Sequence, residues 1–327
     1  MEKIIKDCFL SIIIPIYKNA EYLDEAIKSC IEPDIQIEII LVEDGYSDIT
    51  RKAIKAILQN NYYKNISIKA IYLEKNIGTF LARKKGVQSA TGKYITFLDA
   101  DDYFINNAMS VFYAKLVELE NKDTRYDAIL FQYQRNNVLV PKFPAESSSI
   151  NQQNLTFITY LNKYYNQFIW SSAGKIYHKD ILLQVYKDLD VVTDHLVLAE
   201  DLLVYTIAAK YIKNFYILNQ SLYFYRVHSQ SIMEKITKGR KVFVINQLNK
   251  IEYYLLQETP KNKEYEIILR KAKFRLSIEK LYCKCGFKRS VFYYIGYIYF
   301  MLRHFSVAYV FTIFYQMLLL KLSINNN

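Results

Sequence analysis

The chain has 327 residues, enough for one large domain or two smaller ones with an ample apolar core. A hydrophobic fraction of 52% with only 23% charged residues excludes an intrinsically disordered protein. The net charge of +11 is concentrated in residues 234–327, which hold 17 Lys and Arg against 6 Glu, so that end of the chain is expected to meet an anionic partner, either nucleic acid or a membrane surface.

Strand and helix patterns alternate along the first 130 residues. Apolar, β-branched runs predict buried strands at residues 9–17 and 37–44, and similar patterns predict further strands at residues 66–74, 93–101 and 126–133. Helical spacing of apolar residues predicts helices at residues 20–31, 48–61, 78–90 and 106–120. The alternation predicts an α/β fold with a mainly parallel central sheet and flanking helices. Ligands of such sheets bind beyond the carboxyl ends of the strands.

The second half of the chain is less regular. Residues 134–150 lose their periodicity and gather Asn, Pro and Ser, which predicts a loop. A strand pattern returns at residues 214–227, and from residue 234 onward the pattern is helical, basic and aromatic. Within residues 290–322 the uninterrupted apolar segments are about 12 and 16 residues long, whereas a spanning helix needs about 20. We favour helices lying in a membrane interface over a buried helical hairpin or a transmembrane span.

The cysteines and the N-terminus bear on the compartment. The four cysteines lack the spacing of a metal site, and the apolar run at the N-terminus is too short and too interrupted for a signal peptide. The sequence therefore predicts a reduced, cytoplasmic protein.

The segment FLDADDYF, residues 97–104, places three carboxylates directly after an apolar run. In an extended segment, Asp99 and Asp101 would point to the same side. Two such carboxylates can hold a divalent ion that also binds substrate phosphate, an arrangement that Mg²⁺ prefers. The alternative is that Asp101 or Asp102 caps the helix predicted at residues 105–120.

Two further predicted strands end in polar residues. The segment LVEDGYSD puts Glu43 and Asp44 at the end of one strand, where Gly45 permits a tight turn. In EKNIGTFLARKKG, Gly78 begins a helix and Arg83 lies one turn further on. Backbone N–H groups and a guanidinium at a helix start suit a diphosphate. A turn glycine, a solvated arginine and a capping aspartate are the simpler explanations for each residue taken alone.

The set SIIIPIY, LVEDGYSD, KNIGTFLARKKG and GKYITFLDADD, in this order, resembles the family 2 glycosyltransferases, which have the glycosyltransferase A fold. The resemblance covers residues 9–104. It implies that Pro15 and Tyr17 line a uracil pocket and that Asp44 hydrogen-bonds the base. It also implies that Arg83 lies near the nucleotide.

The resemblance also implies roles for the acidic residues. Asp99 and Asp101 would meet the ribose and a metal ion, Mn²⁺ or Mg²⁺, with Asp101 the firmer metal ligand. The segment LAEDLLVY resembles the Glu-Asp pair that supplies the general base of the family, here Glu200 and Asp201, with Asp201 the base. The simpler alternative is that this pair caps a helix at residues 202–210.

Two fainter matches place further residues near the active site. The segment YRVHSQS resembles a Tyr-Arg-x-His segment and would bring Arg226 and His228 there, and WSSAGKIYHK resembles the acceptor-side strand, with Trp170 available to stack on a sugar. His228 as an ordinary loop histidine and Trp170 as a core residue remain open. The sequence departs from the family pattern at Lys18, Glu43, Tyr46 and Lys84, which weakens any assignment of the donor sugar.

The resemblance implies an inverting glycosyltransferase that moves a hexose or N-acetylhexosamine from a UDP-sugar to a hydroxyl of a glycan or lipid-linked acceptor. Residues 1–105 would bind the nucleotide sugar, residues 106–233 would complete the catalytic domain on the acceptor side, and residues 234–327 would attach to the cytoplasmic face of an anionic membrane. A lipooligosaccharide core would be a natural acceptor.

Three alternatives are disfavoured. A nucleotidyltransferase would carry a Gly-rich loop after the first strand, and PIYKNAEY has no glycine. A processive polysaccharide synthase would carry Gln-x-x-Arg-Trp, but the single Trp follows Phe168-Ile169. A nucleic-acid-binding protein would leave the strand-end motifs unexplained, and the basic charges of the last region alternate with long apolar runs.

Overall fold

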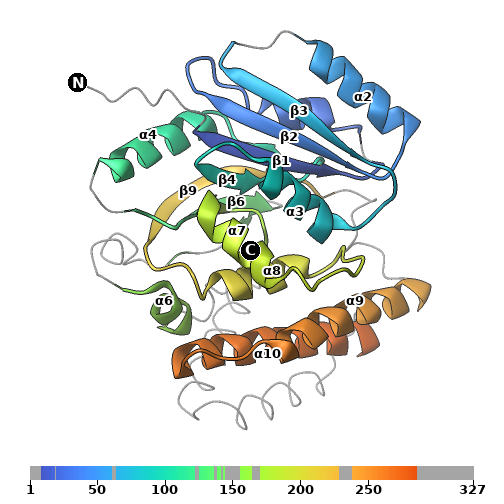
Figure 1. Ribbon diagram of the computed structural model, residues 1–327, viewed down its shortest axis with the longest axis vertical. Coiled ribbons are helices and arrows are strands. Elements are labelled where there is room, and N and C mark those ends of the chain that lie inside the picture. The colour runs from blue at the N-terminus through green and yellow to red at the C-terminus, as the bar shows by residue number, and fades with distance from the viewer. Residues whose placement is uncertain are drawn as a thin grey trace, which may run out of the picture.

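The structure, a computed structural model, describes residues 9–18, 20–60, 64–121, 125–135, 138–140, 143, 155–163, 170–227 and 238–285. Its centre is a nine-stranded sheet with the order β3-β2-β1-β4-β8-β6-β9-β5, in which β7 pairs with β6 (Figure 1). The strands are β1 (Leu10–Ile16), β2 (Ile37–Asp44), β3 (Ile66–Leu73), β4 (Tyr94–Phe97), β5 (Tyr103–Phe104), β6 (Ala128–Arg135), β7 (Val138–Val140), β8 (Lys175–His178) and β9 (Phe215–Tyr225).

Helices cover the sheet on both faces. They are α1 (Leu23–Lys28), α2 (Asp48–Gln59), α3 (Thr79–Ser89), α4 (Ala108–Glu120), α6 (Phe157–Lys163), α7 (Lys179–Asp188), α8 (Glu200–Ala208), α9 (Lys238–Gln257) and α10 (Lys263–Cys285). The α/β architecture predicted from the sequence is confirmed, and α2 and β2 begin at the predicted residues. Helix α1 is shorter than the predicted 20–31, because Tyr22 serves as its N-cap and Ser29 as its C-cap.

The first part of the sheet is parallel. Strands β3, β2, β1 and β4 run in the same direction, with Ile13 beside Ile40 and Phe97. Alternate residues of β1 serve two different cores, because successive side chains of a strand point to opposite faces. Ile13 packs with the helices α3, α7 and α8, whereas Ile12 and Ile14 pack with α1, α2 and α4.

The second part of the sheet is mixed, so the expectation of a mainly parallel sheet holds only in part. Strand β8 is antiparallel to both of its neighbours, β4 and β6, and β9 is parallel to β6 and antiparallel to β5. The antiparallel pairing of β8 with β4 brings a segment from the second half of the chain directly beside the strand that precedes Asp99.

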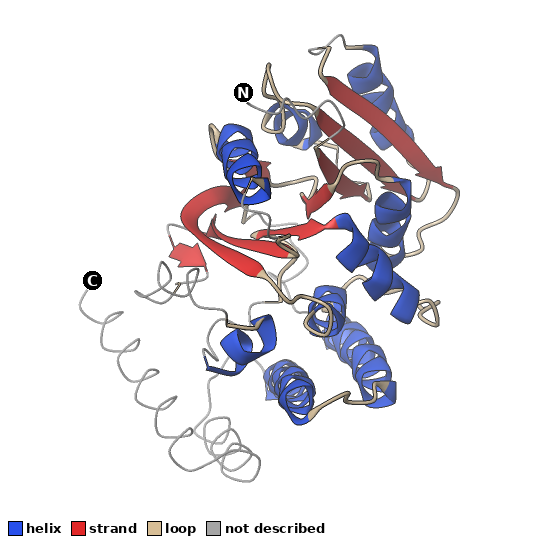
Figure 2. Cartoon of the chain, turned by 60° about the vertical axis from the view of Figure 1, so that its left-hand side comes forward, coloured by secondary structure: helices blue, strands red, loops and turns tan. Residues whose placement is uncertain are grey.

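Helices α9 and α10 form a pair that packs beneath α6 and α8, at the opposite end of the molecule from α2 (Figures 1 and 2). Buried residues of both helices, among them Leu248 and Ile268, belong to the same core as α3, α7 and α8. The first part of the region predicted to be helical and basic is therefore helical and packs on α6 and α8. The segment 290–322 lies outside the described residues. Among the helices that the structure does describe, none is long and apolar enough to cross a membrane.

Candidate active site

The end of β2 is tied to the loop before α3. Both carboxylate oxygens of Asp44 accept backbone hydrogen bonds, from Ile77 at 2.7 Å and from Gly78 at 3.0 Å. Burial raises the pKa of Asp44, although these two bonds act in the opposite direction. Gly45 and Gly78 both have positive φ, as their predicted roles in a turn and at a helix start require. Asp44 thus shapes the strand-end pocket, and its contact with a base stays a prediction.

Tyr17 stands at the open side of the same strand ends. It follows β1, in which Pro15 pairs with Val42, and 48% of its surface is exposed. A side-chain hydrogen bond with Asn76 lowers the pKa of Tyr17. Asn76 Oδ1 also lies 2.7 Å from His195 Nε2, so a residue from the second half of the chain reaches this pocket. Sequence reasoning gave no role to Asn76, although it lies in the segment KNIGTFLARKKG, or to His195, which lies outside the segments that resemble the family.

The acidic residues lie in a turn and not, as expected, in an extended segment. Strand β4 ends at Phe97, and the backbone N–H of Asp102 donates to the carbonyl of Asp99 at 3.0 Å. Asp99 and Asp101 were predicted to point to the same side because alternate residues of a strand do so. In a turn this reason no longer applies. The capping alternative is also wrong, because α4 starts at Ala108 after Asn107, whose side chain makes no capping bond.

The third carboxylate of the turn is buried. Asp102 is 2% exposed and accepts hydrogen bonds from the Tyr223 hydroxyl and from the backbone N–H of Arg226, the latter at 2.8 Å. Burial, followed by the charges of Asp99 and Asp101, raises its pKa well above the usual range. The charges of Asp99 and Asp101 thus disfavour the charged form of Asp102, and a bound cation would reduce this repulsion.

Arg226 fastens the acidic turn to two other elements. Its Nε donates to the carbonyl of Asp101 at 2.8 Å, and its guanidinium pairs with Glu25 of α1 at 2.6 Å. The structure thus brings Arg226 to the acidic turn, as the sequence predicted. His228 lies outside the described residues.

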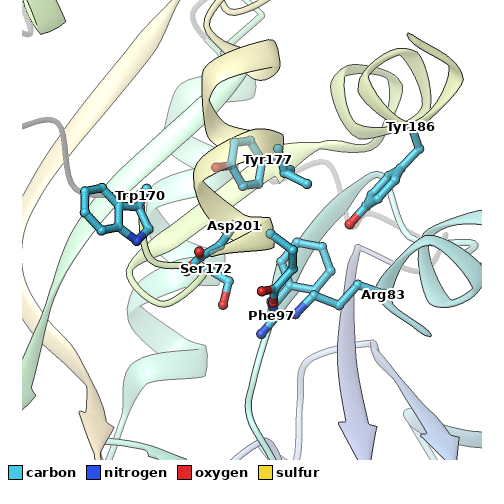
Figure 3. A pocket seen from close by; sticks show the side chains of 9 residues that line it. Arg83, Phe97, Trp170, Ser172, Tyr177, Tyr186 and Asp201 are labelled. Atoms are coloured by element: carbon cyan, nitrogen blue, oxygen red, sulfur yellow. The ribbon is translucent and has the colours of Figure 1, made fainter. Parts of the chain in front are cut away.

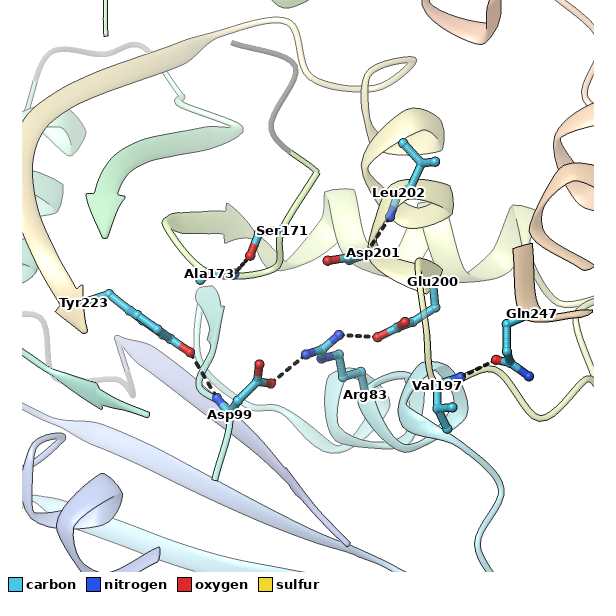
Figure 4. Close-up of polar contacts among 10 residues, drawn as sticks. All are labelled: Arg83, Asp99, Ser171, Ala173, Val197, Glu200, Asp201, Leu202, Tyr223 and Gln247. Carbon is cyan, nitrogen blue, oxygen red and sulfur yellow. Dashed lines mark hydrogen bonds and ion pairs between the residues drawn. The ribbon is translucent and has the colours of Figure 1, made fainter. Parts of the chain in front are cut away.

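Arg83 links the acidic turn to the start of α8 (Figure 4). One guanidinium nitrogen lies 2.7 Å from Asp99 and the other lies 2.7 Å from Glu200. Burial lowers the pKa of the Arg83 guanidinium. The negative charges of Asp99, Glu200 and Asp201 raise this pKa by more, so the net shift is upward. Glu200 is buried, and burial raises its pKa despite the contact with Arg83. Ion pairs therefore link Arg83, Asp99 and Glu200, which were predicted from three separate segments of the sequence.

Asp201 occupies the first turn of α8. The helix begins at Glu200, two residues before the predicted start, and its N-cap is Ala199, which has a left-handed conformation and no capping side chain. The carboxylate of Asp201 accepts the backbone N–H of Leu202 at 2.9 Å. Burial and the charge of Glu200 raise the pKa of Asp201 to about 7. A carboxylate with this pKa can take a proton from a hydroxyl near neutral pH.

A pocket opens in front of Asp201 (Figure 3). Its lining combines charged residues with aromatic rings: Arg83, Phe97, Trp170, Ser172, Tyr177, Tyr186, Glu200, Asp201 and Val204. Trp170 is half-buried, and the guanidinium carbon of Arg275 in α10 lies 4.6 Å from the centre of its ring. Trp170 thus packs against the core, as one interpretation expected, and also lines the pocket, whereas its stacking on a sugar stays a prediction.

Helix α9 holds the loop that leads to Asp201. The Gln247 side chain accepts the backbone N–H of Val197 at 2.9 Å and donates to the carbonyl of His195 at 3.0 Å (Figure 4). In the same loop, the Leu196 carbonyl accepts the N–H of Phe80 at 3.2 Å. The loop is therefore tied both to α9 and to the start of α3, which carries Arg83. No sequence signal marked Gln247.

Within the described part of the chain, no group of three His, Cys, Asp or Glu side chains is arranged to hold a metal ion. The donors present are the hard carboxylate oxygens of the acidic turn, of which Asp99 is 36% exposed and Asp101 half-buried. Mg²⁺ and Mn²⁺ accept such sites when waters and substrate phosphates supply the remaining ligands. The turn fits a divalent ion under that condition.

A mixed sheet with a parallel first part, and a pocket lined by a buried carboxylate and by an arginine that is bonded to an acidic turn, is compatible with a nucleotide-sugar-dependent glycosyltransferase. Residues 11–185 match the family description "Glycosyl transferase family 2", which is more than half of the chain. The protein belongs to this family and is a glycosyltransferase. The match favours sugar transfer over the nucleotidyltransferase and nucleic-acid-binding alternatives.

Two curated relatives show how far the similarity extends. An uncharacterised glycosyltransferase of Mycoplasma genitalium is 33% identical over 128 residues, which is 38% of this chain and 41% of the relative. The chain thus matches about two fifths of that relative's length. The cholesterol galactosyltransferase of Borreliella burgdorferi is 24% identical over 267 residues, covering 79% of this chain and 70% of the relative.

Two solved structures share the fold. TarS of Staphylococcus aureus, residues 1–349, superposes with a TM-score of 0.58 at 20% identity over 89% of this chain and 79% of that one. TarS has also been solved in complex with UDP-GlcNAc. The mannosyltransferase PcManGT of Pyrobaculum calidifontis, solved with GDP-Man and Mn²⁺, gives a TM-score of 0.55 at 11% identity over 97% of this chain and 81% of that one. These likenesses establish the glycosyltransferase A fold.

Proposed function

We propose that the protein is an inverting glycosyltransferase that moves a hexose or N-acetylhexosamine from a UDP-sugar to a hydroxyl of a glycan or lipid-linked acceptor. One observation carries the proposal: Asp201, a carboxylate with a pKa of about 7, lines the same pocket as Arg83, which is bonded to Asp99 of the acidic turn. A base for the acceptor and a charged cradle for a leaving diphosphate are thus adjacent.

The donor would lie across the ends of β1, β2 and β4. Tyr17 and Pro15 would line the base, and Asp99 would meet the ribose. TarS, which shares the fold, binds UDP-GlcNAc, and this supports a uridine nucleotide. The GDP-Man complex of PcManGT shows that the fold also accepts a guanine nucleotide, so the choice of base depends on side chains such as Tyr17 and Asn76.

Asp101 would hold a divalent ion, Mn²⁺ or Mg²⁺, which when bound supplies positive charge for the leaving diphosphate. The Mn²⁺ in the PcManGT complex supports this role for the fold. Arg83 stays positively charged across the pH range in which an enzyme works. Its two guanidinium nitrogens, one bonded to Asp99 and the other to Glu200, orient both carboxylates. Its guanidinium adds to the positive potential that favours departure of the nucleoside diphosphate.

The transfer would be a single displacement. As the acceptor oxygen attacks the anomeric carbon, its O–H proton passes to the Asp201 carboxylate, and the bond from that carbon to the diphosphate oxygen breaks. The electron pair of the broken bond leaves with the diphosphate. One displacement inverts the anomeric centre. Trp170 and Tyr177, which line the pocket, would pack against the acceptor sugar.

The acceptor would be a glycan or lipid-linked glycan at the inner face of the cell membrane, such as a lipooligosaccharide core. The basic composition of residues 234–327 supports attachment to anionic lipid, and the relative that acts on cholesterol supports a lipid acceptor. Exposed apolar residues of α9, namely Val242, Phe243, Tyr253 and Leu256, add to this surface. Sedimentation with liposomes that contain phosphatidylserine tests it: we expect binding that weakens as salt is raised, and no salt-sensitive binding would contradict it.

The function itself is tested by calorimetric titration of UDP in the presence of Mn²⁺. We expect the native protein to bind UDP and to release UDP from UDP-sugars. The affinity of Asp101→Asn for UDP should be at least tenfold lower. Asp34→Asn, at an exposed position of the same residue type, is the matched control and should bind as the native protein does. If the native protein binds no uridine nucleotide with either metal, the proposal is wrong.

A further inference from the structure

Lys175 is a buried lysine that packs against the helix of the candidate base, over the ring of Tyr205, one turn after Asp201 in α8. It begins β8, and only 4% of its surface is exposed. Its ammonium donates to the backbone carbonyl of Ser171 and lies 4.7 Å from the centre of the Tyr205 ring. Neither group carries a negative charge, and among the described residues no carboxylate lies within ion-pair distance of this ammonium. A buried cation without a close anion is costly and calls for a physical reason.

The reason lies in the charges around Asp201. The charged and titratable groups that face it are Glu200 on α8, Arg83 on α3, Lys175 and Tyr177 on β8, and Tyr133 on β6. Arg83 is already engaged by Asp99 and Glu200, each at 2.7 Å. One guanidinium therefore serves two carboxylates, and Asp201 is a third. Lys175 is the remaining cation among these groups.

The electrostatic coupling runs in both directions. Lys175 is among the groups that lower the pKa of Asp201 against the effects of burial and of Glu200. Burial lowers the pKa of Lys175 to about 7, and the charge of Asp201 opposes that fall. The two groups therefore titrate as a pair, and the form with an ammonium beside a carboxylate is the one in which Asp201 can accept a proton.

We propose that Lys175 is a positioning residue of the transfer reaction, whose buried ammonium keeps Asp201 in the carboxylate form when the acceptor hydroxyl arrives. The inference rests on the proposed function of Asp201 as the base. Lys175 touches neither reacting atom and transfers no proton itself. After the hydroxyl proton has moved to Asp201, the ammonium is unchanged, so the proton balance of the step is that of Asp201 alone.

The experiment is the pH profile of kcat/KM for sugar transfer from a UDP-sugar, measured on the full chain and on three variants. Lys175→Met removes the charge and the hydrogen bond to Ser171. Lys175→Gln keeps a donor for the Ser171 carbonyl without the charge. Lys175→Arg keeps the charge. Binding of UDP with Mn²⁺ reports whether each variant is folded, because the contacts of the Lys175 ammonium, with Ser171 and Tyr205, include no residue of the acidic turn.

We expect the acidic limb of the profile to move to higher pH by about one pH unit in both neutral variants, because a nearby opposite charge lowers a carboxyl pKa. At pH 7 their kcat/KM should fall by about fivefold, since a rise of one unit from a pKa of about 7 lowers the carboxylate fraction by that factor, and part of the loss should be recovered at higher pH. Lys175→Arg should keep the native limb. UDP affinity should change by less than about twofold in all three.

Two results would overturn the inference. The first is a Gln variant with the native profile, which would assign Lys175 to the hydrogen bond with Ser171 alone. The second is a profile that keeps its native limb in every folded variant. Failure of the proposed function looks different, because the native protein would then transfer no sugar from any nucleotide sugar at any pH.

Discussion

The chain before residue 121 and the chain after residue 125 build the site in different ways. The first supplies Tyr17, Asp44 and the acidic turn from the ends of parallel strands, where each functional residue directly follows a buried apolar run. The second supplies Lys175, Asp201 and Arg226 from a strand start, a helix start and a strand end. In a parallel sheet the residues that follow the strands lie at one edge because all the strands run in the same direction. In a mixed sheet, long-range contacts are needed to bring such residues together.

Three of those contacts can be tested one at a time. Arg83 joins Asp99 to Glu200, Gly78 approaches Leu196, and Gln247 holds the loop before Asp201. The comparison therefore predicts that disrupting the second region harms catalysis while nucleotide binding survives. Disrupting a contact between the regions should harm both.

The largest effect is expected for Asp201→Asn. The amide is nearly the same size but cannot accept the acceptor proton, so kcat should fall by about 10²–10⁴-fold. Binding of UDP, which belongs to the first region, should stay within about twofold. Steady-state kinetics and calorimetry measure the two effects. Turnover close to the native value would mean that Asp201 is not the base, and that the second region does not supply the base as the comparison predicts.

Arg83→Met tests the central contact between the regions. It leaves the buried carboxylate of Glu200 without its cation, and breaking a buried pair in this way costs about 3–5 kcal/mol. Urea unfolding measures the loss. Arg270→Met is the control, because its ion pair with Glu266 is exposed and should contribute less than about 1 kcal/mol. Equal losses in the two variants would mean that the regions do not depend on Arg83.

Gly78→Ala tests the backbone approach between the regions. Gly78 has φ +93°, and a Cβ there would lie 2.6 Å from the carbonyl oxygen of Leu196. We expect a loss of about 1–3 kcal/mol in the free energy of unfolding and weaker UDP binding, since the N–H of Gly78 also holds Asp44. Lys85→Ala, at an exposed position of α3, should stay within about 0.5 kcal/mol of the native protein.

The smallest effect is expected for Gln247→Ala, which removes two hydrogen bonds from the loop before Asp201. Stability should fall by about 1 kcal/mol. Because the loop positions Asp201, kcat should fall more than UDP affinity does. Asn246→Ala, one residue earlier and exposed, is the matched control for the same helix. A fall in UDP affinity with an unchanged kcat would place the loop in the first region instead.

The same division explains what the sequence could predict. The strands β1, β2 and β3 were predicted within about a residue or two of their ends, because β1 and β2 are buried, continuous apolar runs and β3 is a β-branched run bounded by turns. The strand end near Asp99 was missed: the predicted strand extends to Asp101, but β4 ends at Phe97 and a turn follows. An apolar strand pattern in the sequence does not show at which residue the strand stops pairing with its neighbour.

The missed residues share a physical cause. Lys175 was quoted within a predicted strand but received no role, because its burial follows from antiparallel pairing with β4 and β6, which the sequence does not encode locally. The contact of Asn76 with His195 and that of Gln247 with the loop join residues far apart in the chain. Asp201 and Arg226 were found only because short motifs around them resemble a family.

The bond between Gln247 and the loop before Asp201 has a consequence for synthesis. A ribosome releases strands β1 to β4 first, and it releases Asp201 well before the helix that holds its loop. A nascent chain that has not yet reached α9 can thus form the sheet edge around Asp44 while the loop before Asp201 remains unanchored. On the proposed function, sugar transfer would begin only after α9 has docked.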